Sequence, residues 1–140
     1  MLHAEASARA ALEAIALQVS EVLATMNAGL TAPLRTLKVD GGASRNDLLM
    51  QVQSDLAGLP LARAAQPETT ALGAALLAGL AAGVWPSLAA VKALALAERT
   101  FTPDGEPQKL AGLRRRWQAA VARSRHWATL LEDGEADFSP

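Results

Sequence analysis

The sequence has 140 residues, and 51% of them are apolar, which is enough for one folded domain with a core of its own. A formal net charge of −1 provides no general attraction to nucleic-acid phosphates or anionic lipids, so we expect no nucleic-acid partner and no membrane partner. The absence of cysteine excludes a disulfide framework and thiolate metal ligands, and we expect a cytoplasmic location.

The first predicted elements are a helix and a strand. Between Ala6 and Met26, apolar residues recur near helical spacing and predict one buried stripe, formed by Leu12, Ile15, Val19, Val22, Leu23 and Met26. The segment Asn27–Gly29 is typical of a helix end. Leu34–Val39 then alternates between apolar and polar residues, which predicts a strand that ends in the turn Asp40–Gly42.

A second helix is predicted after this turn. Ser44 and Asp47 have the spacing of a capping box, which favours a helix start at Ser44. Gly58 is expected to end the helix. Its predicted buried stripe consists of Leu48, Leu49, Val52 and Leu56.

The following segments predict a second strand and two further helices. Leu59–Arg63 is expected to be extended, and Ala71–Ala82 to be a helix. Because that helix is apolar nearly all round, we expect it to be buried between layers. Ser87–Leu96 is typical of a short helix, and Arg99–Thr102 is expected to be extended.

A last helix is predicted at Gln108–Leu131, and residues 132–140 are expected to form a flexible tail. The helix contains the basic run Arg114–Arg116, which is compatible with an adaptor role on a nucleic acid or a membrane surface. A terminal helix docked through one apolar face explains the pattern better. That face would comprise Leu110, Leu113, Trp117, Val121, Trp127 and Leu131.

Helices alternating with strands predict a helix-rich α/β fold with a short parallel sheet. Two short strands do not suffice for the sheet that these helices need. We therefore expect part of a larger α/β domain, which would form a homo-oligomer or associate with the missing part.

The most informative segment is the turn that contains Gly41 and Gly42. Two glycines after a strand leave the backbone open to a ligand, and the helix that follows offers free N–H groups to an anion. These features suit a nucleotide. The motif alone is more typical of an ordinary tight turn between a strand and a helix.

A longer match decides between these interpretations. The segments Leu37–Ala43, Leu49–Gln51, Gln53–Asp55 and Glu68–Ala75 follow in the order seen in the FGGY carbohydrate kinases, and this chain resembles that family, the glycerol kinases in particular. The resemblance implies two actin-like (ribonuclease H-like) domains that bind ATP and a polyol in the cleft between them. Residues 1–131 would form the C-terminal portion of the second domain, the lobe on the ATP side.

The resemblance also implies roles for single residues. Gly42 matches the glycine whose backbone lies against the nucleotide, and Asn46 matches the asparagine at the adenine end. Gly41 and Ala43 complete this nucleotide-binding turn. Three further residues match a segment beside the adenosine pocket, although helix capping and packing explain them equally well: Glu68, Thr70 and Gly73.

The catalytic residues of the family have no counterpart in this sequence. Phosphoryl transfer needs an acceptor hydroxyl, a base and Mg²⁺ around the γ-phosphate of ATP, so we expect no kinase activity from the chain alone. Asp40 stands at a strand end, where turn stabilisation is favoured over catalysis. His3 and His126 show no ligand pattern, so no metal site is predicted in the chain itself. Mg²⁺ would be bound through the nucleotide and the missing part.

Two functions are therefore weighed. In the first, the chain is the ATP-binding part of a kinase for glycerol or a similar polyol or sugar, and the match at Met50–Gln51 and Gln53–Asp55 favours glycerol. In the alternative, it is a non-catalytic nucleotide-binding or protein-interaction module.

Overall fold

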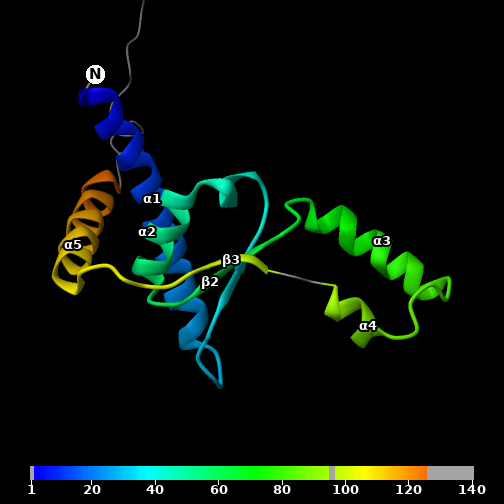
Figure 1. Ribbon diagram of the computed structural model, residues 1–140. Coiled ribbons are helices and arrows are strands. Elements are labelled where there is room, and N and C mark those ends of the chain that lie inside the picture. Colours follow the sequence, from blue (N-terminus) through cyan, green and yellow to red (C-terminus); the bar gives the residue numbers. More distant parts are fainter. Residues whose placement is uncertain (1, 95–96, 126–140) are drawn as a thin grey trace, which may run out of the picture. The chain divides into compact units, whose positions relative to one another are not determined.

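The computed structural model describes residues 2–94 and 97–125, which divide into two compact units (Figure 1). The second unit, Glu106–Pro140, contains α5 (Pro107–Ser124). The first unit, Met1–Gly105, contains α1 (Leu2–Ala28), β1 (Leu37–Val39), the 3₁₀ helix η1 (Gly42–Arg45), α2 (Asp47–Ala57), β2 (Leu61–Ala64), α3 (Thr69–Ala81), α4 (Leu88–Ala93) and β3 (Ala97–Phe101).

The sheet of the first unit has the order β1-β2-β3. Strands β1 and β2 are parallel, as predicted, with Leu37 opposite Leu61. Strand β3 was not expected in this sheet; it runs antiparallel to β2, with Phe101 opposite Leu61, so the sheet as a whole is mixed. The composition of Ala97–Phe101 does not indicate whether β3 runs parallel or antiparallel to β2. That direction depends on the tertiary structure.

The core lies where α1, α2 and the sheet meet, and Figure 1 shows α1 beside α2. Leu56 of α2 and Leu61 of β2 are fully buried, and the hydroxyl of Ser20 on α1 donates to the carbonyl of Leu56 at 3.0 Å. The other buried apolar residues around this contact are Ala16, Leu17, Leu23, Leu49, Met50 and Phe101. The helix pair and the strands thus share one apolar centre.

The predicted buried stripes of α1 and α2 were partly wrong. Ile15, Val22 and Met26 of α1 are exposed, and so is Leu48 of α2. Helical spacing identifies apolar positions, but α1 packs through the face that carries Ala16, Leu17 and Leu23. Leu12 and Val19 are half-buried, and Ile15, Val22 and Met26 lie on a side of α1 that the described residues of the first unit leave exposed.

The prediction that α3 is buried between layers was also wrong for the described structure. None of its residues is buried, and 59% of the Leu77 surface is exposed. In the first unit α3 packs on α4, and this contact covers only part of a helix that is apolar all round. A helix of this apolar composition is expected to pack against more protein than the described residues provide.

Helix α5 confirms the start of the predicted last helix, with Pro107 in its first turn. Four residues of the predicted apolar face are half-buried: Leu110, Leu113, Trp117 and Val121. Arg115 and Arg116 are exposed. The predicted positions of Trp127, Leu131 and the tail 132–140 lie outside the described residues, as does His126.

Candidate functional site

The turn between β1 and α2 is open on the side of its two glycines. Gly41 has φ 79° and ψ 175°, a conformation that is essentially restricted to glycine. Gly42 is exposed, its φ is not positive, and a Cβ atom added to it would meet no atom within 4 Å. The backbone at Gly42 is thus accessible to a ligand, and glycine there is not required by the fold.

The start of α2 differs from the predicted capping box. Ser44 is buried in η1, and its hydroxyl donates to the carbonyl of Gly41 at 2.7 Å. Asn46 is the N-cap of α2, and its Oδ1 atom accepts a hydrogen bond from the backbone N–H of Leu49 at 3.0 Å. The 3₁₀ turn separates Ser44 from the helix, so the capping role passes to Asn46. The amide nitrogen of Asn46 is the end that is left to contact a ligand.

A buried arginine lies beneath this turn. Arg63 of β2 is 8% exposed, and its Nη1 atom donates to the carbonyl of Ser44 at 3.0 Å and to Oδ1 of Asp47 at 2.7 Å. Its Nη2 atom donates to Glu98 of β3 at 3.3 Å. From the sequence, Arg63 is expected only to be the last residue of a strand. An inward position of the alternating strand Leu61–Ala64 was the signal that this charge is buried.

Arg99 joins the same cluster. It pairs with Oδ2 of Asp47, and its guanidinium lies 4.6 Å from the ring centre of Phe101, while that of Arg63 lies 5.4 Å from the same centre. The hydrogen bond from Arg63 lowers the pKa of Asp47; burial opposes this shift, and the positive charge of Arg99 adds to it. The hydrogen bond to Asp47 in turn raises the pKa of Arg63. The cluster therefore joins β2 and β3 to the start of α2.

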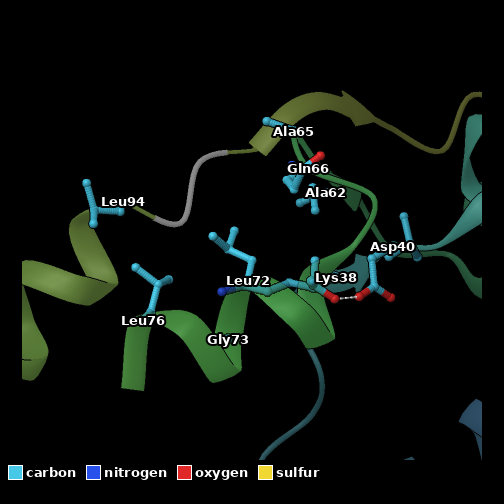
Figure 2. Close-up of a pocket in the computed structure, with 12 residues that line it drawn as sticks. Lys38, Asp40, Ala62, Ala65, Gln66, Leu72, Gly73, Leu76 and Leu94 are labelled. Atoms are coloured by element: carbon cyan, nitrogen blue, oxygen red, sulfur yellow. Dashed lines mark hydrogen bonds between the residues drawn. The ribbon is translucent and has the colours of Figure 1, made fainter. Parts of the chain in front are cut away.

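A cavity of about 500 Å³ lies beside the carboxyl end of β1. Figure 2 shows Leu72 and Leu76 of α3 on one side of it and Ala62 of β2 on another. The cavity is lined by Lys38, Val39, Asp40, Ala62, Ala64, Ala65, Gln66, Thr69, Leu72, Gly73, Leu76 and Leu94. Its walls are mainly apolar, and Lys38 and Asp40 are its charged residues.

Asp40 links the cavity to the turn. It lines the cavity next to Gly41, and one carboxylate oxygen accepts a hydrogen bond from the hydroxyl of Thr69 at the start of α3. The N–H of Gly41 donates to the carbonyl of Pro67 at 3.3 Å. The turn is thus held against the segment that leads into α3.

The predicted site residues fall into two groups. Gly41, Gly42, Ala43 and Asn46 lie together in the turn and at the helix start, outside the cavity lining. Of the three predicted pocket-lining residues, only Gly73 lines the cavity. Glu68 is the N-cap of α3 without a capping hydrogen bond from its side chain, and Thr70 is exposed in the first turn of that helix.

Ser54 and Asp55, which belong to the segment whose match favoured glycerol, make hydrogen bonds within the protein. Oδ1 of Asp55 accepts hydrogen bonds from the N–H groups of Asp104 at 3.0 Å and Gly105 at 3.2 Å. The buried hydroxyl of Ser54 lies within hydrogen-bond distance of the carbonyls of Leu59 and Phe101. The contacts with Phe101, Asp104 and Gly105 hold the end of β3 and the loop after it on α2. Among the described helices, none has the length and hydropathy that a membrane span requires.

Comparison with known proteins agrees with the resemblance seen in the sequence. Residues 3–82 match the model of the FGGY family of carbohydrate kinases, C-terminal domain. The chain is 54% identical over 121 residues to the glycerol kinase of Bordetella parapertussis, and 47% identical over 129 residues to that of Deinococcus radiodurans. These matches cover 86% and 92% of this chain, but only 24% and 25% of the relatives.

Solved structures show the same relationship. The crystal structure of Plasmodium falciparum glycerol kinase with ADP superposes with a TM-score of 0.73 and 34% identity, over 84% of this chain and 24% of that one. Xylulose kinase from Lactobacillus acidophilus shares the fold, with a TM-score of 0.68, 22% identity and coverage of 89% of this chain and 26% of that one. This chain spans about a quarter of the length of these proteins. The match over residues 3–82 shows that the chain belongs to the FGGY family of carbohydrate kinases, whose C-terminal domain it represents.

Proposed function

We propose that this chain is the nucleotide-binding part of a kinase that transfers the γ-phosphoryl group of ATP to glycerol or a similar polyol. The observation that carries the proposal is the open turn at Gly42, followed directly by Asn46 at the start of α2. A bare backbone permits close approach of a nucleotide, and the amide of Asn46 supplies a hydrogen-bond donor beside it. The related Plasmodium enzyme has a crystal structure with ADP, which supports an adenine nucleotide as the ligand.

The rest of the reaction needs groups from outside this chain. The polyol site and the base that accepts the hydroxyl proton are proposed to lie in the three quarters of the relatives that this chain does not cover. Mg²⁺ would be bound through the phosphates of the nucleotide and that same part. The residues of this chain would bind and orient the adenosine end, and the complete protein is expected to act in the cytoplasm.

The exposed apolar faces support the proposed association with the missing part or with a second copy. Ile15, Val22 and Met26 leave one such face on α1, and Leu72 and Leu77 leave another on α3. Exposed large apolar side chains of this number are typical of surfaces that a partner covers. A complex would bury it.

The variant Gly42→Ala tests the nucleotide site. The added methyl group meets no protein atom, so the melting temperature should stay unchanged while ADP binding weakens about tenfold or more. Calorimetric titration of the 140-residue chain with ADP measures this affinity. Gly29→Ala, in the connection before β1 and hence at the opposite end of that strand, is the matched control and should bind ADP as the unaltered chain does. Equal ADP affinity of the Gly42→Ala variant and the control would contradict the proposal.

The alternative function is a non-catalytic nucleotide-binding or protein-interaction module. A nucleotide-binding module also predicts ADP binding, so affinity alone does not separate it from part of a kinase, whereas a protein-interaction module predicts no ADP binding. Glycerol-dependent ADP production after addition of the missing part separates them, since a non-catalytic module gives none.

A further inference from the structure

Arg63 is the one buried cation among the described residues, and its contacts converge on the turn that carries Gly42 and Asn46. A buried charge is costly unless it is paired and hydrogen-bonded. Here one guanidinium nitrogen contacts both the turn and α2, through the carbonyl of Ser44 and the carboxylate of Asp47. The other contacts Glu98 on β3. The side chain therefore joins three elements of the first unit.

The two contacts of Nη1 lie on either side of Asn46. Ser44 precedes it in η1, and Asp47 follows it as the first residue of α2. Both Gly42 and Asn46 are exposed, whereas Arg63 is buried, so Arg63 supports the turn from within the protein. Ser44 lies between Gly42 and Asn46 in the chain. A shift of the Ser44 carbonyl would therefore change the backbone positions of both residues.

The geometry of the cluster requires a guanidinium. A planar fork can donate to a carbonyl, to Asp47 and to Glu98 at once, whereas the ammonium of lysine is a single point charge. The Nε atom of Arg63 is buried without a hydrogen-bond partner among the described residues. The side chain thus makes its polar contacts through Nη1 and Nη2 alone, and both sets are directed at the turn, α2 and β3.

We propose that Arg63 is a positioning residue for nucleotide binding, which holds the Ser44 carbonyl and the Asp47 carboxylate so that Gly42 and Asn46 face one ligand. The inference rests on the proposed function, because it concerns the same turn. It assigns Arg63 no contact with the nucleotide itself.

The test compares Arg63→Lys with Arg99→Lys in the 140-residue chain. Both arginines pair with Asp47 and lie over the ring of Phe101, but only Arg63 reaches the carbonyl of Ser44. Two quantities are measured: amide hydrogen exchange at residues 43–49 without nucleotide, and the dissociation constant for ADP. For Arg63→Lys we expect faster exchange in the turn and about tenfold weaker ADP binding. For Arg99→Lys we expect both to stay within about twofold of the unaltered chain.

The outcomes are distinguishable. Unchanged ADP affinity in Arg63→Lys, or equal losses in both variants, overturns the inference and leaves the proposed function standing. A chain that binds no ADP before any substitution overturns the proposed function and with it the assignment of Arg63. Should Arg63→Lys fail to fold, Asp47→Ala replaces it, because the Asp47 side chain is 52% exposed and alanine removes the oxygen that accepts the hydrogen bond from Arg63 without opening the core. ADP binding should then weaken, and unchanged affinity overturns the inference.

Discussion

Gly41 and Gly42 are neighbours in one turn, but their backbone geometries give substitutions opposite consequences. The positive φ of Gly41 places it in a region that residues with a Cβ atom rarely adopt. The conformation of Gly42 is open to any residue, and space around it is free. Gly41 thus shapes the turn, whereas Gly42 leaves room for what binds to it.

Replacement of Gly41 by alanine should lower the free energy of unfolding by about 1 to 3 kcal/mol, the strain of forcing an L-residue into this conformation. Urea denaturation of Gly41→Ala and Gly42→Ala, side by side, measures the difference. Equal stabilities of the two variants would show that the turn does not hold the φ described here.

Asn46 combines a structural contact with a proposed ligand contact, and two substitutions separate them. Asp at this position keeps the oxygen that caps α2 and loses the amide donor, whereas Ala loses both. We expect Asn46→Ala to destabilise the chain by about 1 kcal/mol and Asn46→Asp to leave stability nearly unchanged. Both should weaken ADP binding in calorimetric titration. If Asn46→Asp bound ADP with unchanged affinity, the amide nitrogen of Asn46 would not be a ligand contact.

At the scale of the elements, one ion-pair cluster fastens α2 to the sheet. Asp47 starts the helix, while Arg63 and Arg99 belong to two different strands. Local sequence does not bring these three side chains together: the antiparallel pairing of β2 and β3 places Arg63 opposite Arg99, and the packing of α2 adds Asp47. The stability of this junction should therefore depend on the charge of Asp47.

The pH dependence follows from the lowered pKa of Asp47. Its stabilising pairing is complete above the ordinary value of 3.8 and is lost as the pH falls below 3.8, through the lower pKa of the folded state. Melting temperatures from pH about 5 to about 2 should therefore fall less steeply for Asp47→Asn than for the unaltered chain. Glu5→Gln, an exposed position of α1 outside the cluster, should keep the original slope. Identical slopes for both variants would show that Asp47 is not the group that titrates.

At the scale of the whole molecule, α3 is a helix whose apolar surface is left largely uncovered by the described residues. It is apolar nearly all round, yet none of its residues is buried in the described structure. Its composition and the quarter-length coverage of the relatives both agree with the proposed association, in which a further part would cover this surface. Activity should then depend on reassembly.

We expect no glycerol-dependent ADP production from the 140-residue chain alone, and production once the missing part, taken from a related glycerol kinase, is added. Leu77→Asp places a charge on the exposed face of α3, so it should abolish this restoration without lowering the melting temperature of the chain. Thr31→Asp adds the same charge at an exposed polar position and should restore activity normally. ADP production by the chain alone would place the catalytic groups within it.

The order of the elements and the place of the turn could be read from local patterns. Gly41 and Gly42 after an alternating segment predicted the strand, the turn and the helix that the structure contains, because backbone conformation there depends on near neighbours. The ordered match from Leu37 to Ala75 led to the family for the same reason, since it needs no knowledge of which segments touch.

Contacts between distant segments lay beyond such patterns. The direction of β3, the exposed side of α1 at Ile15 and the burial of Arg63 each depend on a partner far away in the sequence. Helical spacing counts apolar residues but does not say which of two apolar faces meets a neighbour. Arg63 therefore acquired its place beneath the turn only when β2, β3 and α2 came together, because a buried charge is stable only beside the groups that pair with it.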